Sequence, residues 1–599
     1  MRQVFKKNIS RAVPSYCLTG QLDGFGQMKL RNNNQRWISI WLLFAVLIWW
    51  GCSTTHITLA IAYQDADSTN SGQFHGQYES AEQRRQAEVG SRLNQVLKNG
   101  TELERSRRWG EALNVYQQAI KQFPSDQSLL QRRAVARIHY DFERRYSDSS
   151  FLSSVQTTDV TTALETYSEI LSKIQLYYVD PPDWADLCSY GLTSLEVALM
   201  SQEFRERYIP DATEQQIRRV ILQTREQLGR YEVDNPHDAD RVVRATAVWL
   251  KNSIDLPVQA TVYEFICGAI SALDPYSSYM SRDQFNETMS QIEGNFVGLG
   301  VELKTHDDHL EIVNVIPGGS ADRGGVLPGD QITSVDGVRV IEIGGDRAAD
   351  LLRGPELTYV NISLRRQASA DADTDSQIAL KLQRLRVEIP SIDATQMVDV
   401  QQGIGYVRIN NFQKTTVRDF DQALWNLNQQ GMKCLIVDLR GNPGGLLKAS
   451  VDLADRFINT GVIVSTKGRN PIEDFTHHAN PATTWRIPLV VLVDGQSASA
   501  SEIFAAAIRD HKRGFIVGET TFGKGSVQGI FPLHSAGGVR LTTAKFFSPL
   551  GNPISDVGVR ADEEVETETQ QTLLKPEMFG GEDIGLSKAI QSARRIFPN

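Results

Sequence analysis

Residues 488–530 constrain the fold of this chain more than any other stretch. They begin with PLVVLV, a short apolar run whose length and valine content are typical of a strand buried on both faces of a parallel sheet. A turn at 494–496, a cluster of serine and alanine, and apolar residues at helical spacing over 502–510 follow. Residues 514–518 predict a second strand, beyond which Lys524 lies between two glycines. This order indicates an α/β fold, with serines at the carboxyl end of a strand where a helix begins.

A serine at such a position can act as a nucleophile if a base is close to it. The loose amides and the dipole at the start of a helix favour a developing negative charge. Lys524 can serve as the base if burial lowers its pKa by roughly 3 units, at a cost of about 4 kcal/mol. No carboxylate flanks it in the sequence to hold the ammonium charged, since its neighbours are Phe522, Gly523, Gly525 and Val527. Gln528, four residues further on, could accept a hydrogen bond from the amine or orient it.

Two segments of this stretch, SASASEIFAAAIRD and ETTFGKGSVQ, closely resemble the carboxy-terminal processing (tail-specific) serine peptidases. The resemblance extends from about residue 240 to residue 565. It implies a ClpP/crotonase-like parallel-sheet core and a Ser-Lys dyad, with Ser499 as the nucleophile and Lys524 as the base. Gln528 matches the third member of the Ser-Lys-Gln arrangement of that family.

Three other interpretations use the same residues. Ser499 and Glu502 also form a capping box, and capping is a sufficient role for Glu502, which we consider a supporting residue one helical turn beyond the serine. GETTFGK approaches a phosphate-binding loop, but Gly525 stands where Ser or Thr should hold magnesium, and SVQGIFPL predicts a strand where that motif opens a helix. His511 or His534 could replace the lysine, as in a Ser-His-Asp enzyme, although no spacing favours either.

A second glycine-rich turn is expected to lie beside the serine. GIGYVRINNF and KCLIVDLR predict strands separated by a helix, so the alternation indicates a largely parallel sheet with right-handed crossovers. GNPGG then follows the carboxyl end of one strand, where sites in such sheets collect. Gly444 or Gly445, together with the amide of Ala500, could form an oxyanion hole, and the resemblance assigns that role to this loop. A turn into the next helix would by itself also explain NPGG.

Residues 289–388 resemble a PDZ domain. FVGLGVEL supplies a Gly-Leu-Gly loop before a strand, and EIVNVIPGGSADRGGVLPGDQITSVDGVRV predicts strand, short helix and hairpin in the order of that fold. In such domains the loop amides hold the terminal carboxylate of a peptide, and the strand edge and a small pocket recognise its last residues. Gly298, Leu299 and Gly300 are therefore the candidates for the carboxylate-binding loop.

The N-terminal sequence predicts export. Residues 1–36 carry seven Lys/Arg and a single acid, and residues 37–64 contain no Asp, Glu, Lys or Arg. A basic flank before an apolar core predicts a signal peptide or a signal anchor with its N-terminus inside. Small residues at 60–62 offer a cleavage site and Gly51-Cys52 hints at lipidation, so both secretion and anchoring in the inner membrane by residues 37–62 stay open. In either case the body would be extracytoplasmic, in a periplasm-like compartment.

The remaining segments are mostly helical by periodicity. Trp109, Ala112, Tyr116, Ala119 and Pro124 are spaced as in one tetratricopeptide repeat, although a generic amphipathic hairpin explains them too, and a partner could bind there. We expect an α/β peptidase core with an inserted PDZ domain and a helical N-terminal region. In chain order the segments are 1–36, basic and cytoplasmic; 37–62, signal peptide or anchor; 63–100, linker; 101–159, helical hairpin; 160–288, helical part of the peptidase; 289–388, PDZ domain; 389–565, catalytic core; and 566–599, a helical tail that docks or dimerises.

Composition excludes some partners. The net charge of −10 argues against a nucleic acid, no metal-ligand spacing occurs, and the resemblance implies neither metal nor cofactor. Of five cysteines, Cys188, Cys267 and Cys434 are widely spaced in apolar contexts, which predicts no disulfide framework and leaves only a Cys188–Cys267 bridge open.

The resemblance implies a serine endopeptidase that cleaves proteins near their C-termini, with a PDZ domain that recognises nonpolar tails. The alternative is a non-catalytic PDZ adaptor or scaffold at the membrane, which would not need both Ser499 and Lys524. A penicillin-binding-type acyltransferase requires Ser-x-x-Lys, and no lysine of this chain has serine three positions before it.

Overall fold

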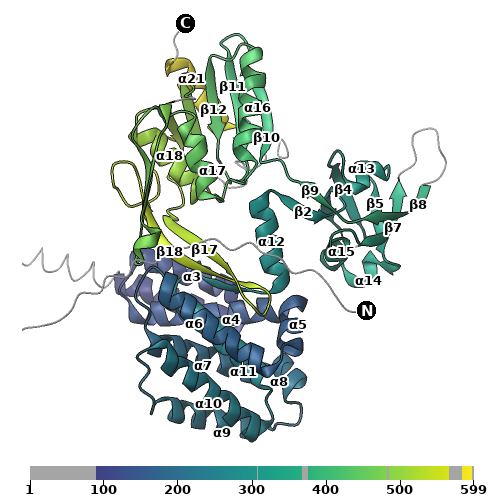
Figure 1. Cartoon of the computed structure of the whole chain (residues 1–599), viewed down its shortest axis with the longest axis vertical. Coiled ribbons are helices and arrows are strands. Elements are labelled where there is room, and N and C mark those ends of the chain that lie inside the picture. The colour runs from purple at the N-terminus through teal and green to yellow at the C-terminus, as the bar shows by residue number, and fades with distance from the viewer. Residues whose placement is uncertain (1–88, 307, 367–375, 482–483, 566–582, 597–599) are drawn as a thin grey trace, which may run out of the picture. The chain divides into compact units, whose positions relative to one another are not determined.

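The computed structural model describes residues 89–306, 308–366, 376–481, 484–565 and 583–596 (Figure 1). The predicted basic segment, the signal segment and most of the predicted linker lie outside these residues. The chain divides into two compact units, Met1–Arg92 and Leu93–Asn599, and the elements below belong to the second. Within the described ranges, no helix combines the length and apolar character needed to cross a bilayer.

A mostly parallel sheet forms the core that follows residue 389. Only β10 runs antiparallel to its neighbour. One face carries α16 (Thr416–Gln429), α17 (Leu447–Asp455) and α18 (Ala500–Asp510), and the other carries α21 (Ile584–Ile596). The predicted α/β class with a parallel-sheet peptidase core is therefore confirmed. The strand order is β10 (Ile392–Asp399), β11 (Ile404–Ile409), β12 (Cys434–Asp438), β15 (Leu489–Val493), β16 (Phe515–Gly518) and β19 (Glu563–Glu564).

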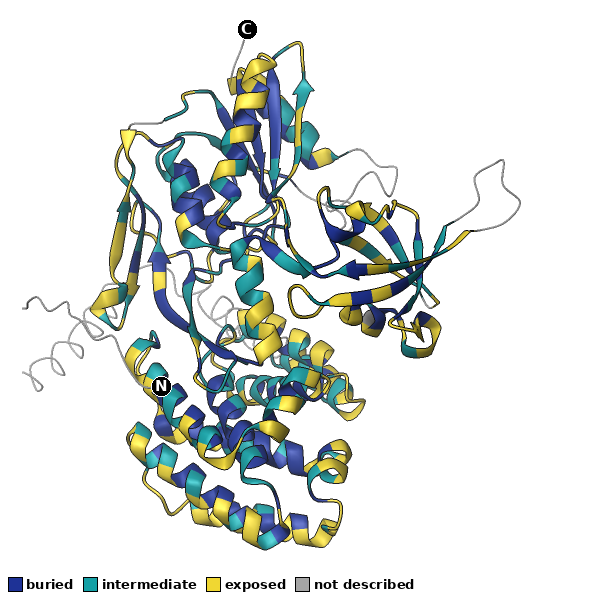
Figure 2. Ribbon diagram, turned by 45° about the vertical axis from the view of Figure 1, so that its right-hand side comes forward, coloured by how far each residue is buried: buried dark blue, intermediate teal, exposed yellow. Residues whose placement is uncertain are grey.

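The apolar runs of the two central strands follow from this three-layer arrangement. Every residue of β12 and β15 is buried, and Figure 2 shows the central strands of this sheet in the buried colour. In β15, Val491 and Val493 pack toward α17 and α18, whereas Val490 and Leu492 pack toward α21. Helices cover both faces, so these strands are continuously apolar instead of alternating.

The C-terminal helix α21 docks on the sheet of its own chain. Ala589 and Ala593 pack against β12, β15 and β16. Arg440, at the end of β12, donates through both terminal nitrogens to Asp583 at 2.9 Å, and the same guanidinium binds the buried carboxylate of Asp438. Of the two alternatives for this tail, the structure supports docking.

A second, antiparallel sheet carries the segment after Lys524. It joins β1 (Ser278–Met280), β18 (Gly538–Phe547), β13 (Val462–Gly468) and β14 (Phe475–His478), and β17 (Ser526–Pro532) pairs with β18. Because β1 follows the helical region in sequence and β18 belongs to the core segment, their pairing fastens the two regions together.

The helical region supplies the largest hydrophobic cluster, which includes residues of α4 to α11 and of β18. Its helices are α3 (Trp109–Gln122), α4 (Gln127–Tyr146), α5 (Ser149–Thr157), α6 (Val160–Tyr177), α7 (Trp184–Met200), α8 (Gln202–Tyr208), α9 (Glu214–Leu228), α10 (Pro236–Ile254) and α11 (Val258–Ser271). α12 (Arg282–Glu293) leads on toward the PDZ domain.

Two details of this region differ from the expectations. Residues 93–105 are helical where a linker to residue 100 was predicted, because Leu93, Val96 and Leu97 have apolar partners on α3 to pack against. Cys188 and Cys267 are both free thiols, so the bridge left open by the sequence is not formed. Burial raises the pKa of each thiol to about 12.

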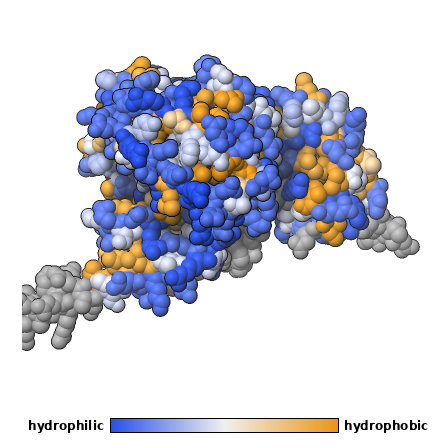
Figure 3. Space-filling model, turned by 90° about the horizontal axis from the view of Figure 1, so that it is seen from below, coloured by the Kyte–Doolittle hydropathy of each residue, from blue (hydrophilic) through white to orange (hydrophobic). Residues whose placement is uncertain are grey.

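The PDZ domain is inserted through a two-stranded ribbon. The incoming β2 (Asn295–Gly298) pairs antiparallel with the outgoing β9 (Leu385–Glu388). The predicted PDZ insertion is confirmed. Figure 3 shows apolar side chains gathered on one face of this domain. Between the two ribbon strands lie β3 (Val301–Thr305), β4 (Leu310–Val315), α13 (Ser320–Arg323), β5 (Gln331–Val335), β6 (Val338–Arg339), α14 (Val340–Ile343), α15 (Gly345–Leu352), β7 (Tyr359–Arg366) and β8 (Ser376–Gln383).

Candidate active site

Ser499 lies in the turn between β15 and α18 with a strained backbone. Its φ of 55° and ψ of −111° are unusual for a residue with a side chain, and such conformations cost of order 1–3 kcal/mol and cluster at functional sites. The residue is half-buried. A strained serine on a strand-to-helix turn is the arrangement that exposes nucleophiles in other hydrolase folds.

Glu502 connects this turn to the loop that carries Lys524. Its Oε2 atom accepts the amide of Ser499 at 2.8 Å and the amide of Lys524 at 2.9 Å. Its Oε1 atom accepts the Thr521 hydroxyl at 2.6 Å and the Gly523 amide at 2.7 Å. The carboxylate is fully buried, and burial raises its pKa while these hydrogen bonds oppose the rise. One side chain thus holds the backbones of Ser499 and Lys524 next to each other.

Removal of this carboxylate should destabilise the fold. In Glu502→Ala three amides and one hydroxyl lose their acceptor, and each unsatisfied buried group costs about 1–3 kcal/mol. We expect the free energy of unfolding in urea to fall by at least about 3 kcal/mol. Glu502→Gln keeps one acceptor oxygen and should lose less. A change below about 1 kcal/mol in Glu502→Ala would contradict this role.

Lys524 is half-buried and has no carboxylate partner among the described residues. Gly523 has a φ of 89°, and a Cβ on Gly525 would lie 2.2 Å from the amide nitrogen of Ser555, so both flanking positions require glycine. Among the described residues, no acid forms an ion pair with Lys524. Burial first and the nearby Arg540 second lower the pKa of the amine, against smaller opposing effects of Asp274 and Glu502. A lysine in these surroundings is suited to accept a proton.

Gln528 lies on β17 with its amide group fixed. Its Nε2 atom donates to Ser526 Oγ at 3.2 Å and to Thr542 Oγ1 at 2.9 Å. Its Oε1 atom is buried and accepts no hydrogen bond from the described residues. Gln528, which we expected to orient the Lys524 amine, therefore has an acceptor oxygen without a donor among the described residues.

The GNPGG loop lies directly against the serine. A Cβ on Gly444 would come within 2.8 Å of the Ser499 Cβ and 2.9 Å of the Ala500 nitrogen, which only glycine permits. The Gly444 amide already donates to Asn442 Oδ1 at 2.9 Å. By contrast, the amides of Gly445 and Ala500 have no backbone or side-chain acceptor within the described ranges. Asn442 was missed in the sequence, where its only signal is its place in the GNPGG turn.

The histidine alternatives are remote from the serine. His511 follows the far end of α18, eleven helical residues or about 16 Å beyond Ser499, and its Nε2 atom binds the Val462 carbonyl at 2.7 Å. The ring of His534 is exposed and contacts Glu169. Neither is placed to serve as the base.

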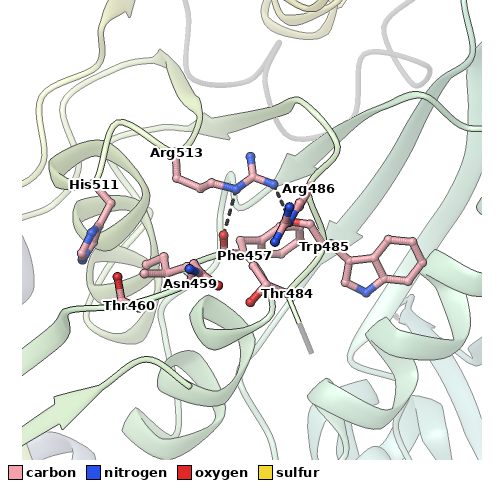
Figure 4. A pocket seen from close by; sticks show the side chains of 9 residues that line it. Phe457, Asn459, Thr460, Thr484, Trp485, Arg486, His511 and Arg513 are labelled. Carbon is pink, nitrogen blue, oxygen red and sulfur yellow. Dashed lines mark hydrogen bonds between the residues drawn. The ribbon is translucent and has the colours of Figure 1, made fainter. Parts of the chain in front are cut away.

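A pocket of about 490 Å³ also lies at the far end of α18, where His511 and Arg513 line it (Figure 4). The Arg513 guanidinium donates to the carbonyls of Phe457, Trp485 and Ile487. These hydrogen bonds of Arg513 connect neighbouring loops and have a structural role, so we assign the pocket no part in the reaction.

The candidate carboxylate-binding loop of the PDZ domain lies between β2 and β3. Leu299 is buried and its carbonyl accepts the Ala321 amide at 2.8 Å, and the Gly300 carbonyl accepts the Ile316 amide at 2.9 Å. Gly300 has a φ of 81°. In the part of the chain that the structure describes, the amides of Leu299 and Gly300 donate to no backbone carbonyl. Gly298 ends β2 in register with Leu385.

Comparison with known proteins places the chain in a family. Residues 403–565 match the model of peptidase family S41, and residues 311–366 match a PDZ domain. The carboxy-terminal-processing protease of Bartonella bacilliformis is 35% identical over 337 residues, which are 55% of this chain and 74% of the relative. The carboxyl-terminal-processing protease of Synechocystis is 35% identical over 310 residues, 51% of this chain and 71% of the relative.

Among solved structures, the photosystem II D1 C-terminal processing protease is similar with 28% identity and a TM-score of 0.33, over 60% of this chain and 94% of that chain. The parallel-sheet core and the inserted PDZ domain are those of a PDZ-containing peptidase. The chain belongs to peptidase family S41, the carboxy-terminal-processing proteases. The family resemblance noted in the sequence is confirmed, and the adaptor interpretation is not supported.

Proposed function

We propose that this enzyme cleaves proteins near their C-termini, with Ser499 as nucleophile, Lys524 as general base and Gln528 as the residue that orients the amine. The observation that carries this assignment is the Glu502 carboxylate, whose Oε2 atom accepts both the Ser499 and the Lys524 amide. The names of the relatives support the choice of C-terminal segments as substrates.

The reaction would proceed in two halves. Ser499 Oγ attacks the scissile carbonyl carbon, the carbonyl π electrons move to oxygen, and the hydroxyl proton passes to Nζ of neutral Lys524. When the intermediate collapses, the C–N bond breaks and Lys524 gives that proton to the leaving amine. Neutral Lys524 then takes a proton from water, which attacks the acyl-enzyme ester, and the proton goes to the departing Ser499 oxygen.

The oxyanion would be held by backbone amides. Gly445 and Ala500 are the better pair, because the Gly444 amide is engaged by Asn442 Oδ1. Gly444 serves the site through its missing side chain, which lets the loop approach the serine closely.

The PDZ domain would bind the substrate tail. We propose that the loop of Gly298, Leu299 and Gly300 receives the terminal carboxylate, since two of its amides donate to no backbone carbonyl. The proposal also includes a preference for nonpolar final residues and an extracytoplasmic location, with residues 37–62 as a cleaved signal peptide or as an anchor. The segment boundaries given above belong to it as well, except for the end of the linker, which the helix over residues 93–105 replaces. The helical segment of residues 101–159, with the tetratricopeptide-like spacing, is the candidate surface for a partner or a second copy.

The test uses the wild-type enzyme and an unfolded substrate protein with a nonpolar C-terminus. Intact-mass spectrometry should detect products shortened from the C-terminal side. A substrate that binds and remains intact would contradict the proposal and favour the adaptor.

Recognition of the tail carboxylate predicts an effect of amidation. A hydrogen bond to a charged group contributes about 1.5–3 kcal/mol, so amidating the C-terminus of the same substrate should raise KM roughly tenfold or more. Steady-state cleavage of the paired substrates measures the difference. Equal KM values would exclude carboxylate capture by this loop.

A further inference from the structure

Tyr276 lies in a short loop whose shape is fixed by its own aspartate. Asp274 Oδ1 accepts the amides of Tyr276 at 2.7 Å and Ser277 at 3.0 Å, and Oδ2 accepts the Ser277 hydroxyl at 2.6 Å. Three short bonds from one carboxylate leave the backbone of residues 274–277 little freedom.

Two arginines from distant parts of the chain hold the same loop. Arg137 of α4 donates from Nη1 to the Asp274 carbonyl at 2.8 Å. Arg540 of β18 donates from Nε to the Tyr276 carbonyl at 3.1 Å and from Nη2 to Ser278 Oγ at 3.1 Å. The backbone that carries Tyr276 is therefore held jointly by the helical region and the antiparallel sheet.

The ring meets the amine of Lys524. Nζ lies over its face, 5.0 Å from the centroid, within the distance at which an ammonium is attracted to an aromatic quadrupole. Lys524 has no carboxylate partner among the described residues, so no ion pair competes with this contact. During acylation the amine changes from neutral to charged, and a ring in this place stabilises the charged form.

We propose that Tyr276 is a positioning residue for Lys524: its ring holds the amine and stabilises the ammonium that forms when Ser499 loses its proton. This inference rests on the proposed role of Lys524 as the base. It adds to the dyad a residue more than 200 positions before the serine.

The charged groups around the amine have opposite effects on it. Arg540, on β18, disfavours the ammonium, and Asp274 in the loop and Glu502 on α18 favour it. Burial raises the pKa of the Tyr276 phenol, and the charge of Asp556 raises it further, so the phenol stays neutral. Burial and Arg540 lower the pKa of the amine and so favour its neutral form, and the ring opposes this shift by stabilising the ammonium.

The experiment compares Tyr276→Leu with Tyr276→Phe in the full chain, through the pH dependence of kcat/KM. The phenylalanine variant keeps the π face. The fall of its kcat/KM at low pH, the acid limb of the profile, should therefore lie at the same pH as in the wild type. The leucine variant keeps an apolar side chain, smaller than the ring, without a π face, so the plateau of its kcat/KM should fall about tenfold. Its acid limb should move to lower pH, because the ammonium has lost a stabilising group.

If Tyr276 had only a structural role, the acid limb of the pH profile would move in the opposite direction. If leucine only loosened the site, water would enter, the pKa of the lysine would rise toward its ordinary value, and the acid limb would move to higher pH. An acid limb that moves up or stays in place, or a phenylalanine variant as impaired as the leucine variant, overturns the inference.

Fluorinated phenylalanines at position 276 provide a second series if the leucine variant unfolds. Each added fluorine weakens the π face with little change in shape, so the acid limb should move stepwise to lower pH. An acid limb that stays at the same pH through the series would overturn the inference. The proposed function is judged separately: an active Lys524→Ala variant would remove that proposal itself. An inactive Lys524→Ala variant together with an unmoved acid limb in the Tyr276 series would remove only the role of Tyr276.

Discussion

Ser499→Ala should reduce kcat by roughly 10⁴- to 10⁶-fold, the loss typical of removing a catalytic nucleophile. The fold should be kept, because the contact that fixes this turn runs from the Ser499 backbone amide to Glu502 and does not use the hydroxyl. Cleavage of a fluorogenic peptide with a nonpolar tail measures the loss, and urea unfolding verifies the structure.

A neighbouring serine supplies the control. Ser501 is fully buried, and its hydroxyl donates to the Asn442 carbonyl at 3.0 Å. Ser501→Ala should cost about 1 kcal/mol of stability and retain most of the turnover. Inactivation by Ser501→Ala with turnover preserved in Ser499→Ala would show that the wrong hydroxyl has been assigned.

Lys524→Ala should reduce kcat/KM by roughly 10²- to 10⁴-fold, the usual contribution of a general base. Lys524→Arg should be about as impaired, because a guanidinium stays charged and cannot take the serine proton. The direction of the pH dependence follows from this role. The amine must be neutral to act as a base, so wild-type activity is present above the pKa of Lys524 and lost below it. Burial and Arg540 lower that pKa, so the fall in activity at low pH should lie below the ordinary range of a lysine amine.

A histidine base would give a different pattern. If Lys524→Arg retained turnover and the acid limb stayed near the ordinary pKa of histidine, about 6.5, the dyad would be wrong. The distance of His511 from Ser499 along α18 argues against that outcome.

The sequence predicted the parts of the site that local patterns determine. The apolar run of β15 and the helix after it predicted a cluster of serines at a strand-to-helix turn, because a buried parallel strand and a helix start leave periodic signals within ten or so residues. The lysine between glycines was a candidate base, and the family resemblance then selected Ser499 among the serines. The family resemblance extended this to the PDZ insertion.

What the sequence could not predict depends on contacts between distant segments. Glu502 was expected to cap α18, and its bonds to Gly523 and Lys524 require a loop some twenty residues away to fold back onto it. The engagement of the Gly444 amide by Asn442 and the placement of Tyr276 over Lys524 are likewise set by tertiary structure. The docking of the C-terminal helix likewise depends on a distant contact, the hydrogen bonds from Arg440 to Asp583.

The central claim is that a neutral Lys524 activates Ser499. A fluorophosphonate probe reacts with a serine in proportion to its activation, and peptide mass spectrometry locates the modified residue. The wild type should be labelled on Ser499, at a rate that rises with pH through the pKa of Lys524, and Lys524→Ala should be labelled at least about a hundredfold more slowly. Modification of another serine, or equal rates in the wild type and Lys524→Ala, would contradict the account.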